Sequence, residues 1–412
     1  MNYRVFVKLG SMPEAPEAKQ FSLLIKPASA DCNLACTYCF YLPKAGLYPE
    51  SSRHRMSEAT LKHLISTYMA TDQDSYSFGW QGGEPTLMGV EFFRKVVDLQ
   101  SRYGRPGSIV SNGLQTNATM ITDELARLLA EYRFLLGVSL DGPEEIHNTY
   151  RKNRKGAGSY SRVIEGIDRL NKHQVQFNIL VAVNAANVGM ARRLYNFLLD
   201  RDIRYHQYIP IVEFDEQGRP LPFSIDGPRW GAFLKELFEV WYPDAGRVSI
   251  RLFDALLTYL VDGSRIMCTM GSNCRRYFLI EHNGDVYPCD FFAAPELRLG
   301  NLLETEWSDL MKSSRYEAFG RQKAQWNEAC GSCPYLDLCM GDCLKHRFYG
   351  PPAARSDPGR LSWLCSGWKI FYESCLPGLR RIARRIQRQR SRELETHLAS
   401  SAYQFRNPER GR

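Results

Sequence analysis

Residues 32–39 read Cys-Asn-Leu-Ala-Cys-Thr-Tyr-Cys and place three thiols at C-x3-C-x2-C spacing, just after a short apolar run at 21–25. Iron–sulfur clusters are held by cysteine thiolates, so this loop can bring Cys32, Cys36 and Cys39 onto three corners of one four-iron cubane. Three local ligands leave one iron open to bind and activate another molecule, as a three-ligand metal site does. This stretch alone also fits a zinc knuckle, or a ferredoxin-type loop with a distant fourth cysteine.

The chain beyond this loop alternates predicted strands with predicted helices, which indicates an α/β fold. Apolar runs predict strands at 21–29, 75–80, 108–116, 134–140, 175–183 and 203–212, and helical spacing predicts helices at 57–70, 90–103, 123–132, 161–173 and 188–202. Ser57 is the expected cap of the first helix. Such alternation is typical of parallel βαβ units, and six strands predict a partial (β/α)6 barrel. In these folds the chemistry gathers at the carboxyl ends of the strands.

Three polar motifs stand at those predicted strand ends. Gln81-Gly82-Gly83-Glu84-Pro85 follows the second strand, Gln115-Thr116-Asn117 ends the third, and Ser139-Leu140-Asp141-Gly142-Pro143 ends the fourth. The glycines let the backbone approach a ligand closely, and short polar residues suit hydrogen bonds to a cofactor. Taken singly, the first motif favours an ordinary Gly-Pro loop, and the other two are equally typical of Asx or Ser turns.

Taken together, the cysteine loop with Phe40 and Tyr41 behind it and the Gly-Gly-Glu-Pro motif resemble the radical S-adenosylmethionine (SAM) enzymes. The resemblance implies that SAM chelates the open iron and that the Gly-Gly-Glu backbone holds its amino group. The implied cofactor-binding residues are Tyr38, Tyr41, Gln81, Gly82, Gly83, Glu84, Asn117, Ser139 and Asp141. Arg151 or Arg162 is expected to pair with the SAM carboxylate. For most charges of 151–155, a solvated basic loop is the favoured alternative.

The twelve cysteines are unevenly distributed: three lie at 32–39, none in the next 228 residues, and nine between Cys268 and Cys375. This pattern predicts a second, Cys-dense module, which metal binding explains better than disulfides do. Within it, 278–288 has the pattern of a hairpin with Asn283-Gly284 at its turn, delivering Cys289. The eight thiols through Cys365 are enough for two fully ligated four-iron clusters. Two zinc sites are the main alternative.

The Cys-dense module resembles the SPASM extension of peptide-modifying radical SAM enzymes, through 283–290 followed by Leu299-Gly300-Asn301. Several features resemble one family within that group, the anaerobic sulfatase-maturating enzymes. They are Cys289-Asp290, Phe319-Gly320 with Lys323, the cysteine spacing of 330–343, Trp363-Leu364-Cys365 and Phe371-Tyr372. The sequence departs from the usual family pattern at 340–344 and at Phe291-Phe292, without loss of a cysteine.

This resemblance implies roles for particular residues of the module. A first auxiliary cluster is expected on Cys268, Cys274, Cys289 and Cys343, and a second on Cys330, Cys333, Cys339 and Cys365. Cys375 is left over as a structural or free thiol. Asp290, next to the cluster ligand Cys289, is the expected catalytic base.

The same resemblance implies a function. The protein is expected to be a radical SAM oxidoreductase that oxidises a Cys or Ser side chain of a sulfatase to formylglycine, using SAM and three 4Fe-4S clusters. Its expected partners are the sulfatase polypeptide and an electron donor such as ferredoxin or flavodoxin.

Two other classes stay open at this point. One is a SPASM maturase that crosslinks or epimerises a ribosomally made peptide, and the other is a non-catalytic zinc or electron-transfer protein. Such maturases usually carry a leader-binding domain before the loop, whereas 31 residues precede Cys32 here.

Composition and charge bear on membrane insertion, location and nucleic-acid binding. The apolar content of 44% is ordinary for a globular protein. No apolar run reaches the roughly 18 residues of a membrane-spanning helix, and the first twenty residues lack a signal-peptide pattern, so the cytoplasm is the expected location. Ten Arg and three Glu give 376–412 a charge of +7, which leaves +1 of the total +8 for the body. A near-neutral body argues against a broad nucleic-acid surface.

The predicted organisation has five parts. They are a mobile leader (1–20), the barrel (21–225), a helical bridge (226–265), the SPASM domain (266–375) and a basic helical tail (376–412). In the tail, Leu379, Ile382 and Ile386 recur at helical spacing between arginines. Such a helix can bind acidic protein, a membrane surface or nucleic acid. We expect instead that its apolar edge docks on the body and that the tail is dispensable for chemistry on a short peptide.

Overall fold

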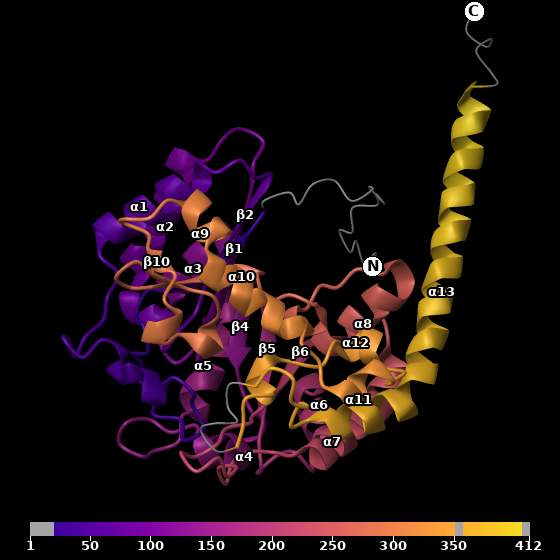
Figure 1. Ribbon diagram of the computed structural model, residues 1–412. Helices are drawn as coiled ribbons and strands as arrows, with labels where there is room; N and C mark the ends of the chain where they lie inside the picture. The colour runs from indigo at the N-terminus through magenta and orange to yellow at the C-terminus, as the bar shows by residue number, and fades with distance from the viewer. Residues whose placement is uncertain (1–19, 351–356, 406–412) are drawn as a thin grey trace, which may run out of the picture.

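The computed structural model describes residues 20–350 and 357–405, so the predicted leader lies outside the described residues except for Gln20. One ten-stranded sheet runs through the molecule in the order β10-β9-β8-β1-β2-β3-β4-β5-β6-β7 (Figure 1). The strands are β1 (Ser22–Lys26), β2 (Ser75–Trp80), β3 (Ile109–Thr116), β4 (Leu135–Ser139), β5 (Gln176–Val183), β6 (Tyr205–Pro210), β7 (Ser249–Ile250), β8 (Tyr277–Glu281), β9 (Asp285–Tyr287) and β10 (Gly300–Asn301). All six predicted barrel strands are present, which confirms the α/β fold.

Helices connect the successive parallel strands β1 to β7. They are α1 (Glu58–Met69), α2 (Val90–Tyr103), α3 (Asp123–Glu131), α4 (Glu144–Tyr150), α5 (Tyr160–Lys172), α6 (Ala191–Leu199) and α7 (Gly227–Trp241). α8 (Arg251–Asp262) follows β7 and precedes the Cys-dense part. That part adds α9 (Trp307–Lys312), α10 (Ser314–Arg321), α11 (Glu328–Gly331), α12 (Leu336–Cys339) and α13 (Cys365–Phe405). As predicted, Ser57 caps α1, because its Oγ accepts a hydrogen bond from the Thr60 N–H at 3.0 Å.

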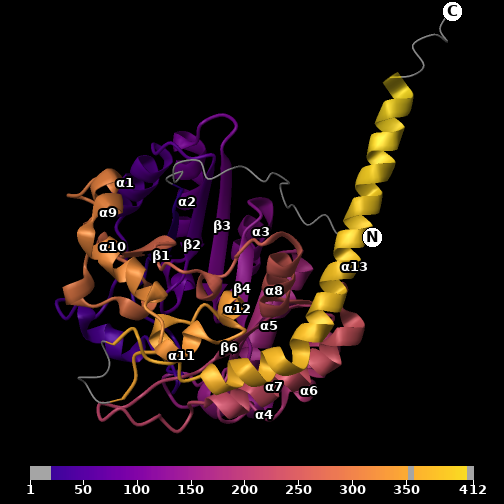
Figure 2. The same ribbon diagram turned by 45° about the vertical axis from the view of Figure 1, so that its right-hand side comes forward.

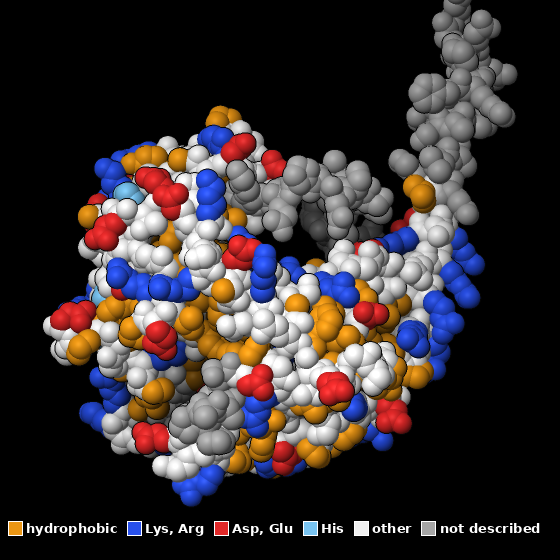
Figure 3. All heavy atoms as spheres, in the orientation of Figure 1, with side chains coloured by type: hydrophobic (Ala, Val, Ile, Leu, Met, Phe, Trp, Pro, Cys, Tyr) orange, Lys and Arg blue, Asp and Glu red, His pale blue; other side chains and the backbone are white. Residues whose placement is uncertain are grey.

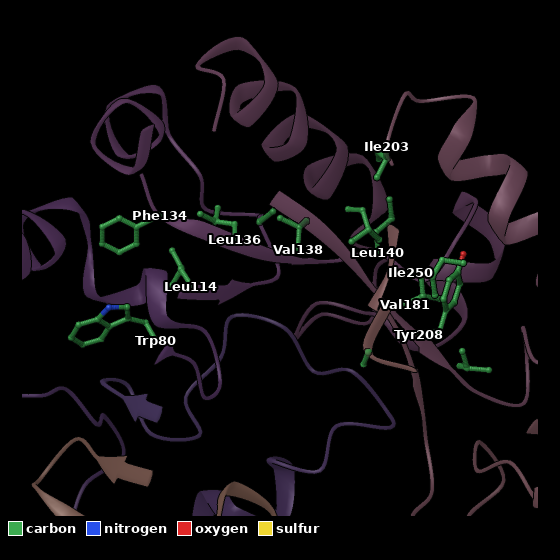
Figure 4. Close-up of a cluster of buried hydrophobic side chains, with 14 of the residues drawn as sticks. Trp80, Leu114, Phe134, Leu136, Val138, Leu140, Val181, Ile203, Tyr208 and Ile250 are labelled. Carbon is green, nitrogen blue, oxygen red and sulfur yellow. The ribbon is translucent and has the colours of Figure 1, made fainter. Parts of the chain in front are cut away.

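The core lies between the parallel strands and the helices that cover them. Apolar side chains from neighbouring strands stand in register: Trp80 pairs with Leu114, and Leu114 pairs with Leu136. Figure 4 shows these side chains as part of one buried cluster that continues to Val138. Buried and more exposed positions alternate along β2, β3 and β4, so one face of each of these strands packs in this core.

The register of the sheet brings the polar motifs to a common edge. Ile25 pairs with Trp80, and Thr116 pairs with Val138, so β1 to β4 end at nearly the same level. The cysteine loop and the three predicted polar motifs all follow these ends. The strand ends of the barrel therefore hold the candidate site, as parallel topology predicts.

The Cys-dense part continues the same sheet. Its predicted hairpin forms as the antiparallel pair β8–β9, and β8 lies parallel to β1. Lys26 of β1 is paired with Glu281 of β8 in this register. The turn of the hairpin therefore lies at the edge where β1 ends, and β9 runs back from that edge beside β8.

The long helix α13 joins the Cys-dense part to the tail. It begins at Cys365, contains Pro377 and bends as it leaves the body (Figure 2), because an internal proline removes a backbone hydrogen bond. Leu379 and Ile382 are buried against the body, whereas Leu394 is exposed. The apolar edge of the tail is therefore docked as expected, and Figure 3 shows Lys and Arg side chains along the outer side of the helix.

Within residues 20–350 and 357–405, none of the helices is both long enough and apolar enough to cross a membrane.

Candidate active site

The three cysteines of 32–39 lie close together in the loop after β1. The Cys39 N–H donates to the Cys36 carbonyl at 3.0 Å, and the Leu34 N–H donates to Cys32 Sγ at 3.3 Å. Burial raises the pKa of Cys32 to about 12, and the charges of Cys36 and Cys39 contribute to that rise. Three thiols gathered in one short loop fit a cluster held by this loop.

The Gly82-Gly83 pair packs against the backbone that enters the cysteine loop. Gly82 has a φ of 113°, and a Cβ on Gly83 would lie 2.0 Å from the carbonyl oxygen of Asp31. The Gly83 N–H donates to the Ser29 carbonyl at 2.9 Å, and the Glu84 N–H donates to the Asp31 carbonyl at 2.8 Å. With those donors engaged, the glycine carbonyl oxygens are the groups that can receive an amine, which fits the SAM amino group.

The Glu84 side chain ties the end of β2 to the end of β3. Its Oε1 accepts hydrogen bonds from the Thr86 hydroxyl at 2.6 Å and the Thr116 hydroxyl at 2.8 Å. Its Oε2 accepts from the Asn117 N–H at 2.7 Å. The carboxylate is fully buried and engaged on both oxygens, so its side chain positions the two strand ends.

Tyr38, Asp141 and Arg151 form a buried chain beside the cysteine loop. The Tyr38 hydroxyl donates to Asp141 Oδ2 at 2.5 Å and accepts from Arg151 Nη1 at 2.9 Å. Asp141 Oδ1 accepts from the Ala182 N–H at 3.1 Å. Arg151 Nε is buried and has no hydrogen-bond partner among the described residues. It is therefore a free donor, of the kind that suits the SAM carboxylate.

The other predicted cofactor residues are placed differently. Asn117 Nδ2 contacts Cys32 Sγ at 3.6 Å and donates to Asn33 Oδ1 at 2.9 Å, so Asn117 holds the cysteine loop. Ser139 ends β4. Arg162 is exposed and donates to the Thr119 carbonyl at 3.2 Å, away from the Tyr38–Arg151 chain. Of the two arginines considered, the geometry favours Arg151.

Asp290 lies at the meeting point of the barrel and the Cys-dense part, and 4% of its surface is exposed. The Tyr41 hydroxyl donates to its Oδ2, and Gln81 Nε2 lies 3.3 Å from the same oxygen. The Asp290 N–H donates to the Tyr277 hydroxyl, which contacts Cys289 Sγ at 3.4 Å. Asp290 Oδ1 has no hydrogen-bond partner among the described residues. This oxygen, which accepts no hydrogen bond from those residues, is the group that can take a proton.

Three charged residues around Asp290 were missed by the sequence analysis. Lys26 Nζ lies 2.5 Å from Glu281 Oε1 and 3.6 Å from Asp290 Oδ1, and Lys26 and Glu281 are fully buried. Although burial lowers the pKa of Lys26, the charges of Glu281 and Asp290 outweigh it and raise that pKa overall. Lys44 Nζ donates to the Asp290 carbonyl oxygen. In the sequence, Lys26 could have been singled out because it is a charged residue at the end of an apolar strand.

The cysteines of the predicted first auxiliary set influence one another electrostatically. Burial raises the pKa of Cys343, and the charges of Cys268 and Cys289 raise it further. Burial likewise raises the pKa of Cys274 to about 12, with Cys343 as the next cause. The four residues form one group although the chain brings them from distant positions, which fits a shared cluster.

The second predicted set lines one cavity. Cys330, Cys333, Cys339 and Cys365 all face it, and Tyr335, Leu336, Trp368 and Tyr372 are among the residues that complete its wall. Four thiols around a mostly apolar cavity fit a fully ligated iron–sulfur cluster. Cys375 lies outside both sets, fully buried in the core, as expected for a structural thiol.

In the described part of the chain, no three His, Cys, Asp or Glu side chains are arranged to hold a single metal ion. A cluster makes a different demand, because each thiolate binds a separate iron and the sulfurs stand further apart.

Comparisons with known proteins agree with this geometry. Residues 27–198 match the family model described as the radical SAM superfamily, and residues 268–334 match the one described as an iron–sulfur cluster-binding domain, SPASM. The serine-type anaerobic sulfatase-maturating enzyme of Bacteroides thetaiotaomicron is 38% identical over 88% of this chain and 91% of its own length. The cysteine-type enzyme of Clostridium perfringens is 35% identical over 89% of this chain and 99% of its own.

Solved structures also show similarity to an anaerobic sulfatase-maturating enzyme. The structure described as native anSMEcpe with bound AdoMet and Kp18Cys peptide has a TM-score of 0.82 and 35% identity, covering 88% of this chain and 99% of its own. The SAM-bound SuiB of Streptococcus suis, at a TM-score of 0.60 and 18% identity over 84% of this chain and 77% of its own, shares the fold alone.

Fold and site together define a radical SAM enzyme with a SPASM domain. Identity of this extent with several relatives makes the assignment specific. The chain belongs to the anaerobic sulfatase-maturating enzymes.

Proposed function

We propose that this enzyme oxidises a Cys or Ser side chain of a sulfatase polypeptide to the aldehyde formylglycine. The observation that carries the proposal is Asp290: a nearly buried carboxylate with one oxygen held by Tyr41 and Gln81, and the other without a hydrogen bond, 3.6 Å from Lys26 Nζ. It stands between the cysteine loop and the auxiliary ligand Cys289. A base in this position can complete the oxidation of a substrate that has already lost a hydrogen atom.

Three 4Fe-4S clusters and SAM are the proposed cofactors. Cys32, Cys36 and Cys39 would hold the first cluster, and the two auxiliary sets would hold the others. The carbonyl oxygens of Gly82 and Gly83 and the free Arg151 Nε would bind the amino and carboxylate groups of SAM. When bound, this first cluster and SAM supply one-electron chemistry that removes a hydrogen atom from a substrate β-carbon, and 5′-deoxyadenosine carries it away.

The residues around Asp290 prepare it for proton transfer. Lys26 Nζ lies 3.6 Å from Oδ1 in an ion pair, and Tyr41 and Gln81 fix the orientation of the carboxylate. Burial and the Asp290 charge raise the pKa of Tyr41 well above its usual value, so Tyr41 donates its proton in a hydrogen bond and keeps it. Asp290 Oδ1 takes the hydroxyl or thiol proton of the substrate.

The oxidation would balance if clusters held by the two auxiliary cysteine sets took up the second electron. Overall, the substrate loses one hydrogen atom, one proton and one electron. A Ser side chain yields the aldehyde directly, and a Cys side chain yields a thioaldehyde whose hydrolysis exchanges sulfur for oxygen.

The same proposal covers partners, location and organisation. A sulfatase polypeptide is the substrate, and ferredoxin or flavodoxin is the class of electron donor. The twelve free cysteines suit a reducing compartment, so we place the enzyme in the cytoplasm. The barrel, bridge, SPASM domain and tail at 21–225, 226–265, 266–375 and 376–412 are the proposed working units.

The direct test is anaerobic incubation of the iron-loaded enzyme with SAM, a reductant and a sulfatase-derived peptide, read by mass spectrometry. Matched peptides carry Ser, Cys or Ala at the target position. Loss of two hydrogens from the Ser peptide, or the same loss from the Cys peptide with sulfur replaced by oxygen, supports the proposal. An enzyme that cleaves SAM but leaves both peptides unchanged, or that crosslinks or epimerises them, contradicts it.

A further inference from the structure

Two buried cations wrap the short loop that joins the two auxiliary cysteine sets. The loop 339–343 carries Cys339 of the second set at its start and Cys343 of the first set at its end. Lys323 and Arg347 are each 1% exposed, and both point their charged groups at this loop. Burying such charges is costly in free energy unless hydrogen bonds and opposite charges compensate them, so the surroundings of each cation decide that cost.

Lys323 binds the loop through two backbone carbonyl groups. Its Nζ donates to the Met340 oxygen at 2.5 Å and to the Asp342 oxygen at 2.6 Å. Carbonyl oxygens satisfy the hydrogen-bonding capacity of an ammonium group, but they carry no net charge to balance it.

Arg347 binds the same loop from a second direction. Its guanidinium donates to the Gly341 oxygen at 2.7 Å, the Met340 oxygen at 3.0 Å and the Asp342 oxygen at 3.3 Å. Its remaining hydrogen bonds go to the carbonyl oxygens of Lys323, Gln325 and Pro358. The guanidinium is thus surrounded by neutral acceptors.

The backbone of the loop is bent to make these contacts. Met340, Gly341 and Asp342 have φ values of 48°, 68° and 60°, in the left-handed region that non-glycine residues rarely adopt. A Cβ on Gly341 would lie 2.4 Å from Arg347 Nη2, so only glycine allows the guanidinium to approach this closely. The unusual turn aims its carbonyl oxygens at the two cations.

The charge of this group is not balanced by carboxylates. Asp342 is the single acidic residue of the loop, and its carboxylate bonds to His346 and Ser362 instead. In the described part of the chain, neither Lys323 nor Arg347 forms a salt bridge. Asp342 can offset at most one of the two positive charges.

The cysteine thiolates are further negative groups near the two cations. Burial and then Arg347 lower the pKa of Lys323, whereas the charge of Asp342, followed by those of Cys343 and Cys274, acts to raise it. Burial also lowers the pKa of Arg347, and the charge of Asp342, followed by those of Cys330, Cys339 and Cys343, opposes that effect. Lys323 is therefore influenced by cysteines of the first set, and Arg347 by cysteines of both sets.

We infer that Lys323 and Arg347 are positioning residues that favour the reduced state of the auxiliary clusters and hold the two clusters at a fixed separation. A cluster with four thiolate ligands is negatively charged, and each electron it accepts adds a negative charge. A fixed positive charge in a low-dielectric interior stabilises that state. Only the direction of electron flow, from substrate to these clusters, rests on the proposed function.

The test is a redox titration of the iron-loaded enzyme without substrate, followed by electron paramagnetic resonance. In Lys323→Met, the equilibrium constant for one-electron reduction of an auxiliary cluster should fall about tenfold, which equals about 59 mV in midpoint potential. The cluster on 32–39, identified by its response to SAM, should keep its potential and serves as the internal control. Because no substrate is present, failure of the proposed function leaves this test intact.

Matched variants separate charge from shape. Lys323→Arg keeps the positive charge and should keep the wild-type potentials, and Lys312→Met removes a charge from an exposed position of α9 and should also leave them unchanged. Unchanged auxiliary potentials in iron-replete Lys323→Met overturn the inference, as does an equal shift of all three clusters. If Lys323→Met loses auxiliary iron, retention of that iron by Lys323→Arg supports a role for charge, and its loss there overturns it.

Discussion

The two cysteine-bearing regions of this enzyme are built in opposite ways. The loop 32–39 gathers its three proposed ligands within eight residues behind a single strand, and the ends of β2 and β3 brace it through Glu84 and Asn117. The proposed auxiliary ligands are scattered between Cys268 and Cys365, on segments that include the hairpin beside β1 and the loop 339–343 around two buried cations. A local site depends on spacing, whereas a dispersed site depends on the whole fold.

Cys36→Ala is the variant with the largest expected effect, and it should affect the local site while sparing the dispersed one. SAM cleavage should fall to background, because two thiolates of a local loop cannot hold a cluster with an open iron. Iron bound by the auxiliary sets should remain, since none of their ligands lies in the loop. The measurements are 5′-deoxyadenosine formation and iron per chain. Full iron content in this variant would contradict three-cysteine ligation by the loop.

A smaller effect is expected from Glu84→Gln, which tests how the local site is braced. The amide would present an N–H group to the Asn117 N–H in place of an acceptor, and a buried donor left unsatisfied costs about 1–3 kcal/mol. The denaturation midpoint should fall with an unchanged m-value. Glu131→Gln, on the exposed end of α3, is the matched control and should stay within about 0.5 kcal/mol of wild type. Equal midpoints for the two variants would remove Glu84 as a brace.

The contrast between the regions also explains what could be predicted from sequence. The strands and helices of the barrel follow from apolar periodicity, and the cysteine loop and Gly82-Gly83 follow from spacing, because all of these are local. The Lys26–Glu281 pair could not be foreseen, since its partners lie on strands that pair across 255 residues of sequence. The buried Lys323 and Arg347 were equally hidden, because a charged residue in a sequence reads as surface until its neighbours are known.

The smallest effect is expected from truncation of the tail, which contains no cysteine of either site. Truncation after Gln389 keeps the buried Leu379 and Ile382 and the hydrogen bond from Gln387 Nε2 to the Val261 carbonyl at 3.0 Å. Peptide turnover and iron content should therefore match wild type. Loss of either would make the tail part of the catalytic core. A salt-sensitive loss seen only with an intact acidic sulfatase would instead assign the arginines to partner binding.

In the proposed mechanism, hydrogen abstraction belongs to the local site, and completion of the oxidation belongs to Asp290 and the dispersed site. Asp290→Asn, incubated with SAM, reductant and a peptide deuterated at the β-carbon of its target residue, tests this most directly. We predict that deuterium appears in 5′-deoxyadenosine while aldehyde formation falls by about 10²-fold or more, because abstraction needs no base and product formation does. Aldehyde at the wild-type yield, or absence of deuterium from 5′-deoxyadenosine, would contradict the claim.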